Sequence, residues 1–190
     1  IVHRLDRETS GLLVVAKNER AHDALSEQFS RREVQKFYRA LVIGEVTPRE
    51  GRITAPIGRH PVHRTMMTVR PPGQGRDALT LYRVIETIGD FSLLDVEIKT
   101  GRTHQIRVHL HALGHPVVGD AVYGRALWTK VRDPVLRQAM AQLGRHFLHA
   151  YRLGFRHPRS GQKLEFTSPL PEELTAFLAL ARERATSSAA

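Results

Sequence analysis

An acidic side chain, Asp6, lies between two arginines close to the start of the chain, in the run HRLDRETSGLLVVAK. A carboxylate flanked by Arg4 and Arg7 is expected to stay ionised, because nearby positive charge favours the charged form. An ionised carboxylate acts as a nucleophile or as a general base. A lone acid with such neighbours is more often a salt-bridged surface residue. Chemistry at Asp6 is therefore indicated only if other parts of the chain supply partners for it.

The residues after Asp6 indicate how the acid would be positioned. A Thr-Ser-Gly turn at residues 9–11 leads into an unbroken apolar run at 12–16, which is typical of a buried strand. This pattern predicts a charged loop that presents one acid at the end of a strand.

Three further segments contain the other side chains that could take part in chemistry. They are QKFYRA at residues 35–40, TGRTHQIRVH at 100–109, and LGHPVVGD at 113–120 followed by VYG at 122–124. Together with the run around Asp6, these segments resemble, in order and spacing, the signatures of the RluA-type pseudouridine synthases, which isomerise uridine in structured RNA. The resemblance extends to Pro171, over nearly the whole chain. Within the family, IGRHP at 57–61 and LHA at 148–150 look most like the RluD type, which modifies large-subunit ribosomal RNA.

The resemblance implies a catalytic site of three residues. It places the catalytic carboxylate at Asp6, its arginine ion partner at Arg107, and an active-site tyrosine at Tyr38. The tyrosine ring would stack on the target base, and its hydroxyl would handle a proton late in the reaction. Without the resemblance, Arg107 would be interpreted as an exposed helix arginine and Tyr38 as a core residue of an amphipathic strand. The implied reaction needs neither a metal nor a cofactor, and we expect none.

Four more residues are expected to contact RNA. The resemblance implies that Arg4 fills the space left by a uridine that has flipped out of its stack, because a flat guanidinium can stack where a base was. Arg102, Thr103 and His104 are expected at the mouth of the site, on phosphate or sugar. The action of Asp6 stays open among attack on the base, attack on the sugar and deprotonation of the sugar.

The charge balance of the 190 residues favours a polyanionic partner. The formal net charge is +10, and 24 of the 29 Lys and Arg residues are arginine, whose planar fork suits bidentate phosphate contacts. A GC-rich genome would also enrich arginine without a functional reason. We expect ribosomal RNA as the partner, with transfer RNA as an open alternative, and predict no obligate protein partner.

Cysteine content and hydropathy restrict the class of protein further. The chain has no cysteine, which excludes disulfides and thiolate metal sites and fits a cytoplasmic protein. No stretch approaches the run of about 18 apolar residues that a membrane-spanning helix needs.

Pattern and resemblance together predict an α+β fold with a mixed, mainly antiparallel β-sheet and flanking helices. Strands are expected at residues 37–43, 79–86, 91–99, 146–155 and 163–167, with a short one near 66–69, and Gly89-Asp90 is a hairpin-type dipeptide between two of them. Helices are expected after Asn18, over 103–113 with a stop at Gly114, from Pro134 to Gly144 and from Pro171 through Leu180. Residues 1–185 are interpreted as one catalytic domain that lacks its front part, since the family has a strand-rich segment before this point. Residues 186–190 are expected to be a disordered tail.

Two rival functions use the same residues. Four histidines, His104, His109, His111 and His115, cluster within twelve residues, and the last two have the i, i+4 spacing of helical metal ligands. A metal hydrolase is disfavoured because residues 100–119 contain no Asp or Glu to complete a usual ligand set. The second rival is a non-catalytic RNA-binding fragment, which the basic composition alone would support. Replacing Asp6 by Asn would separate an enzyme from a binder.

Overall fold

The long strands of the chain form one mixed sheet against which the helices pack. The computed structural model describes residues 1–187. In this part of the chain, a seven-stranded sheet has the order β1-β8-β2-β7-β6-β3, and β9 pairs with the other end of β8. All pairs are antiparallel except β1 with β8. The strands are β1 (Ser10–Gly11), β2 (Gln35–Ile43), β3 (Glu50–Thr54), β6 (Leu79–Ile88), β7 (Phe91–Ile98), β8 (Leu148–Arg156) and β9 (Lys163–Thr167). The predicted α+β fold with a mainly antiparallel sheet is confirmed.

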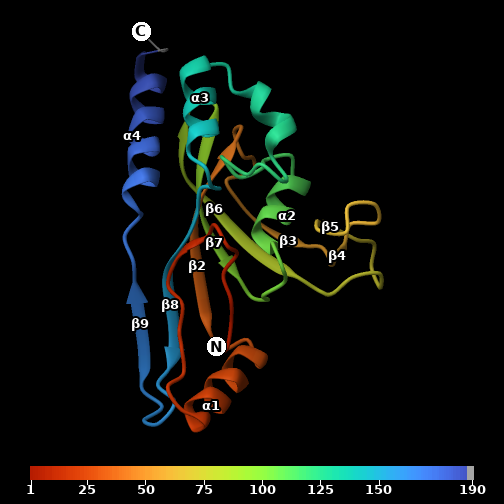
Figure 1. Cartoon of the computed structure of the whole chain (residues 1–190), viewed down its shortest axis with the longest axis vertical. Coiled ribbons are helices and arrows are strands. Elements are labelled where there is room, and N and C mark those ends of the chain that lie inside the picture. The colour runs from red at the N-terminus through yellow and green to blue at the C-terminus, as the bar shows by residue number, and fades with distance from the viewer. Residues whose placement is uncertain (188–190) are drawn as a thin grey trace.

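Helices flank this sheet and its ends (Figure 1). They are α1 (Glu19–Ser30), α2 (Gln105–Ala112), α3 (Pro134–Gln142), α4 (Glu172–Ser187) and a short 3-10 helix, η1 (Arg125–Lys130). The His109 ring of α2 shares a 2.9 Å hydrogen bond with the Thr80 hydroxyl of β6. The Phe177 ring of α4 packs edge-on against Phe91 and Phe147 in the core. Within residues 1–187, none of the helices has the length and apolar character needed to cross a membrane.

Capping and turn residues set the bounds of several elements. Asn18 caps α1, because its Oδ1 accepts a 2.9 Å hydrogen bond from the Ala21 N–H. Asp133 caps α3 in the same way, accepting from a backbone N–H at 2.8 Å. The chain turns at Gly89 between β6 and β7, and Gly114 takes φ +85° after α2 ends. These features confirm the predicted helix starts, the hairpin and the helix stop.

The predicted strand at residues 12–16 is wrong, because only β1 pairs with the sheet and the run after it has no regular secondary structure. Its backbone groups have other partners. The Leu12 N–H donates to the Ala150 carbonyl at 2.9 Å, and the Val14 N–H donates to Nε2 of His3 at 3.0 Å. Every second side chain of the run is exposed, so the segment lies at the surface rather than inside the sheet.

The C-terminal helix is longer than predicted. Helix α4 continues to Ser187, so Thr186 and Ser187 are helical rather than part of a disordered tail. Their hydroxyls donate to the carbonyls of Arg182 and Glu183, each at 3.0 Å, and these bonds one turn back stay within the helix. The rest of the predicted tail, residues 188–190, lies outside the described residues.

A small hairpin projects beyond the sheet next to α2 (Figure 1). It consists of β4 (Ile57–Arg59) and β5 (Met67–Val69), which pair in antiparallel register. The Met67 N–H donates to the Tyr123 hydroxyl at 2.9 Å, and a second apolar cluster around Ile57 and Val108 lies beneath the hairpin. The hairpin is thus fixed to the same helix that carries part of the candidate site.

Candidate active site

Asp6 lies in a tight turn just before β1. The Thr9 N–H donates to the Asp6 carbonyl at 3.0 Å, and the Thr9 hydroxyl shares a 2.8 Å hydrogen bond with Nε2 of His146. Gly11 then brings β1 against β8 with φ +113°, and a Cβ at this position would lie 2.2 Å from the Ala150 carbonyl oxygen. This approach requires glycine, and it fixes the turn that carries Asp6.

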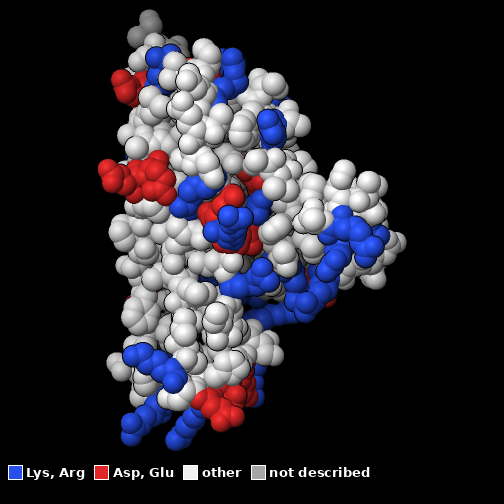
Figure 2. Space-filling model, in the orientation of Figure 1, with Lys and Arg blue, Asp and Glu red and all other residues white. Residues whose placement is uncertain are grey.

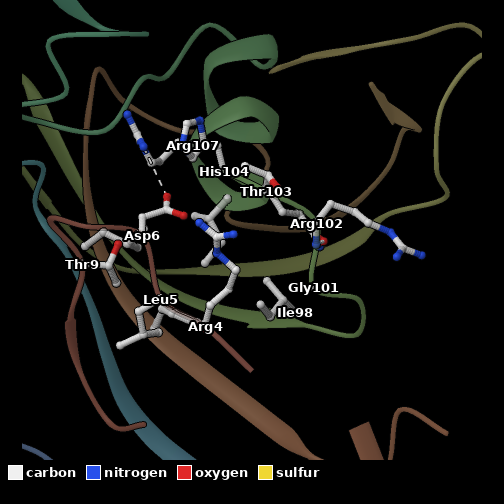
Figure 3. Close-up of a pocket in the computed structure, with 14 residues that line it drawn as sticks. Arg4, Leu5, Asp6, Thr9, Ile98, Gly101, Arg102, Thr103, His104 and Arg107 are labelled. Atoms are coloured by element: carbon white, nitrogen blue, oxygen red, sulfur yellow. Dashed lines mark hydrogen bonds and ion pairs between the residues drawn. The ribbon is translucent and has the colours of Figure 1, made fainter. Parts of the chain in front are cut away.

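Arg107 projects from α2 and is only 5% exposed, unlike the exposed helix arginine that its position alone would suggest. Its Nε and Nη2 donate to the two carboxylate oxygens of Asp120 at 2.7 and 3.0 Å. Its Nη1 donates to Oδ2 of Asp6 at 3.2 Å, the contact drawn as a dashed line in Figure 3. Burial opposes the charge, but the hydrogen bond and charge of Asp120, together with Asp6, raise the pKa of Arg107 above its usual value. The guanidinium is therefore a fixed cation between two carboxylates.

Asp120 was not predicted as a site residue, although it is 1% exposed and holds Arg107 more closely than Asp6 does. Its Oδ1 also accepts the backbone N–H groups of Val122 and Tyr123 at 3.0 and 3.1 Å. Burial opposes its charge, but the hydrogen bond and charge of Arg107 hold the pKa of this carboxyl below its usual range. The available sequence signal was an acid following Gly in the segment after α2, which does not say that the acid faces Arg107.

Tyr38 lies on β2 and is 7% exposed. The pairing of β2 with β8 shifts register between Phe37 and Tyr38, an irregularity that re-aims a side chain. Tyr38 belongs to the main apolar core and also lines the pocket beside Asp6, so its core and active-site interpretations are compatible. Burial, followed by the negative charge of Asp6, raises the pKa of Tyr38 well above its usual range. Its hydroxyl therefore keeps its proton at neutral pH.

One pocket of about 90 Å³ brings the predicted residues together. All seven line it, namely Arg4, Asp6, Tyr38, Arg102, Thr103, His104 and Arg107. Figure 3 shows the Asp6 carboxylate directed toward Arg107, with Arg4 across the pocket from them. Apolar side chains, among them Leu5 and Ile98, complete the wall. A small pocket with apolar walls and a carboxylate suits one flat ring system held against polar groups.

The residues expected at the mouth differ in how they lie. Arg4 is exposed at the rim. Arg102 donates from Nε to the Asp77 carbonyl at 2.9 Å, and its guanidinium extends away from Asp6 in Figure 3. His104 takes a left-handed φ of +56° ahead of α2 and shares a 2.8 Å hydrogen bond with the Tyr123 hydroxyl. Burial lowers the pKa of His104 although Asp6 opposes the shift, so the ring is neutral near pH 7.

The neighbouring histidines have partners in the protein itself. The His109 ring lies between the Thr80 hydroxyl and the Ala55 carbonyl, each at 2.9 Å. The His115 ring bonds the Ile43 carbonyl at 3.0 Å. Among residues 1–187, no group of three or more His, Cys, Asp or Glu side chains is arranged to hold a metal ion.

Basic side chains gather on the face that contains the pocket. Figure 2 shows Lys and Arg in a band that runs from the middle of the molecule toward the β4–β5 hairpin. Such a band adjoining a small pocket is the charge distribution expected for a polyanion whose individual units enter the pocket.

Comparison with known proteins identifies what this arrangement is similar to. The family model described as RNA pseudouridylate synthase matches residues 1–112. An uncharacterized RNA pseudouridine synthase of Chloroflexus aurantiacus is 51% identical over 98% of this chain and 54% of its own length. The ribosomal large subunit pseudouridine synthase D of Nitrosomonas europaea is 49% identical over 94% of this chain and 50% of its own length. The chain thus spans about half the length of these curated relatives.

Solved structures give the same result for the fold. The human RNA pseudouridylate synthase domain containing 1 superimposes with a TM-score of 0.71 at 35% identity, over 90% of this chain and 68% of that one. The human RNA pseudouridylate synthase domain containing 4 superimposes with a TM-score of 0.74 at 25% identity, over 95% of this chain and 75% of that one.

Proposed function

Because the chain belongs to the RluA-type RNA pseudouridylate synthase family, we propose that the protein isomerises uridine to pseudouridine in RNA. The proposed substrate is large-subunit ribosomal RNA. The name of the Nitrosomonas europaea relative supports this choice, as do the segments at residues 57–61 and 148–150. A ribosomal substrate would also place the enzyme in the cytoplasm.

The observation that carries the proposal is the ion-paired series Asp6, Arg107 and Asp120, of which Asp6 and Arg107 line the same pocket as Tyr38. Arg107 gives Asp6 one hydrogen bond at 3.2 Å, which orients the carboxylate while leaving its other oxygen for a substrate. Tyr38 lines the same pocket, so a base lying on its ring would be within reach of that oxygen.

The reaction needs only one such carboxylate. The bond between N1 and C1′ of the uridine breaks, the base turns, and C5 joins to C1′. The C5 proton then leaves while N1 gains one, so no electrons and no external group are consumed. Asp6 supplies the carboxylate by attack on the base, attack on the sugar or removal of a sugar proton. In each case Arg107 holds it in place.

Two further residues serve steps before and after this chemistry. A paired or stacked uridine must first leave its stack, at a cost of about a few kcal/mol. Arg4, exposed at the rim, stacks in the space that the base leaves. Tyr38 stacks on the flipped base, and its protonated hydroxyl joins the late proton transfer at C5 as a hydrogen-bonding group.

Tritium release from RNA labelled at C5 of uridine tests the proposal, because the C5 proton is lost only if the base is rejoined through C5. We expect release from large-subunit ribosomal transcripts with this chain and none with Asp6→Asn. Asp23→Asn removes an exposed acid of α1 and is the matched control, which should release tritium like the parent chain.

The rival function makes the opposite prediction. A non-catalytic RNA-binding protein would bind ribosomal transcripts equally well with Asp6 or Asn at position 6 and would release no tritium from either. Binding of that kind, without release from ribosomal or transfer RNA, would overturn the proposed activity.

A further inference from the structure

A second hollow, of about 440 Å³, opens beside the catalytic pocket and shares five lining residues with it, including Arg4 and Tyr38. Six Lys and Arg side chains line this hollow and no Asp or Glu does. They are Arg4, Arg32, Lys36, Arg76, Lys99 and Arg102. We call it the basic hollow. A molecule that enters the catalytic pocket from the basic hollow must therefore pass these basic side chains.

Lys36 is the unusual member of this set. It is 8% exposed at the start of β2, and none of the ion pairs among residues 1–187 includes its ammonium. The negative charge of Glu97 raises the pKa of Lys36, but this carboxylate is already paired with Lys99. Burial first, and then the charges of Lys99, Arg102 and Arg32, lower the pKa of Lys36 to about 8. A buried cation that is repelled from several sides costs free energy unless an anion joins it.

Two structural features constrain the side chains around Lys36. Its Nζ lies 5.8 Å from the centroid of the Phe29 ring, which limits where the ammonium can move. Arg32, at the end of the turn after α1, holds a left-handed φ of +61°, a conformation that is uncommon for arginine. Backbone strain of this kind tends to occur where a side chain is placed for function.

We infer that the basic hollow binds a backbone phosphate of the RNA strand, next to the uridine that enters the catalytic pocket, and that Lys36 is the buried ligand of this phosphate. The inference rests on the proposed function for the identity of the anion. The hollow suits an anion because its six cations come from several segments of the chain and no Asp or Glu lines it. Its wall is shared with the catalytic pocket through Arg4, so a strand that places one base beside Asp6 carries its phosphates into the hollow.

Amine labelling tests the phosphate site without requiring catalysis. The probe is a 2′-O-methyl uridine trinucleotide with phosphodiester linkages, and its control carries neutral methylphosphonate linkages. Acetic anhydride at pH 8 labels neutral amines, and mass spectrometry follows Lys36 and the exposed Lys163. A bound phosphate favours the ammonium form and covers it, so the charged trinucleotide should slow labelling of Lys36 at least fivefold and leave Lys163 unchanged. Equal labelling of Lys36 with both probes would overturn the inference.

Lys36→Met supplies the second test, with Lys163→Met as the matched control. Methionine keeps the length and apolar body of lysine and removes an unpaired buried charge, so we expect an equal or higher thermal midpoint. Affinity for ribosomal transcripts should fall roughly tenfold, and the slope of log affinity against log salt should fall by about one. Lys36→Arg should recover part of the affinity.

The outcomes separate this inference from the proposed function. Phosphate protection of Lys36 with no tritium release would retain the anion site and reject the catalysis. Tritium release with unchanged affinity and salt slope in Lys36→Met would retain the catalysis and reject the site. Should Lys36→Met fail to fold, Lys36→Gln and the labelling result decide.

Discussion

Arg107 donates two hydrogen bonds to Asp120, at 2.7 and 3.0 Å, along the side of its guanidinium that bears Nε. The remaining Nη1 reaches Asp6. Asp120 is itself held by two backbone N–H groups of the turn that follows it. The orientation of the proposed catalytic carboxylate is therefore set through Arg107 by Asp120, a buried acid that does not line the pocket.

Replacing Asp120 by Asn should lower kcat without changing KM. The amide keeps the shape but loses one acceptor and the negative charge, so Arg107 is no longer held from both sides. A small misplacement of a catalytic group costs roughly a hundredfold in rate, which we expect in single-turnover tritium release. The change also leaves a buried cation less well paired and should lower the free energy of unfolding by about 3 kcal/mol. Loss of RNA affinity equal to the loss of rate would contradict a positioning role.

Tyr38→Phe should separate the ring from the hydroxyl. Phenylalanine keeps the stacking surface, so RNA affinity should stay within about twofold of the parent chain, because base–aromatic stacking is a property of the ring. Removal of the hydroxyl that hydrogen-bonds during the late proton transfer should slow tritium release by roughly a hundredfold or more. Tyr38→Leu, which removes the ring as well, should weaken RNA binding in addition. Release at the parent rate by Tyr38→Phe would show that the hydroxyl has no part in the proton transfer.

Local sequence signals predicted the elements of this fold well wherever a single residue controls the backbone. The side chain of Asn18 caps α1, and the chain turns at Gly89 and Gly114 where expected. The apolar run at 12–16 misled because hydrophobic residues alone indicate burial but not pairing. Its amides bond the carbonyl of Ala150 and the ring of His3, which no short-range pattern reveals.

The candidate site likewise combines residues that the sequence predicts with contacts that only the folded chain reveals. The position of Asp6 next to Arg107 was expected only from the family resemblance, because the two residues lie 101 positions apart in the chain. The role of Asp120 depends on how the turn after α2 folds back toward that helix. The sequence does not distinguish Asp120 from the other Asp and Glu residues as a partner of Arg107. The basic hollow likewise joins residues of several segments, so its geometry exists only in the folded chain.

Gly11→Ala should be strongly destabilising although it adds a single methyl group. The new Cβ would lie 2.2 Å from the carbonyl oxygen of Ala150, and the φ of +113° disfavours any L side chain. β1 must therefore move away from β8, taking the Asp6 turn with it. We expect a loss of about 2 kcal/mol or more in urea unfolding, with a matching fall in tritium release. Gly73→Ala is the control, since it shares a positive φ but has open space around it.

His146 should make the fold sensitive to acid. Its ring is buried, Nε2 bonds the Thr9 hydroxyl, and Nδ1 has no hydrogen-bond partner, since Oε2 of Glu8 is 3.6 Å away. Burial, followed by the charge of Arg107, lowers the pKa of His146 from 6.5 to about 4. Between these values the unfolded chain binds a proton that the folded chain refuses, so stability is lost as the pH falls from 6.5 toward 4.

The size of this effect can be isolated with His146→Gln, which retains a polar partner for Thr9 but does not titrate. Over the full window the histidine should contribute a loss of roughly 3 kcal/mol. Urea unfolding from pH 7.5 to 4.5 measures it as the divergence between the two proteins. Other groups with altered pKa values, such as His3 at about 4, are common to both and cancel in the difference. The parent should lose stability more steeply below pH 6.5, whereas parallel profiles would mean that His146 accepts its proton as readily in the folded state as in the unfolded one.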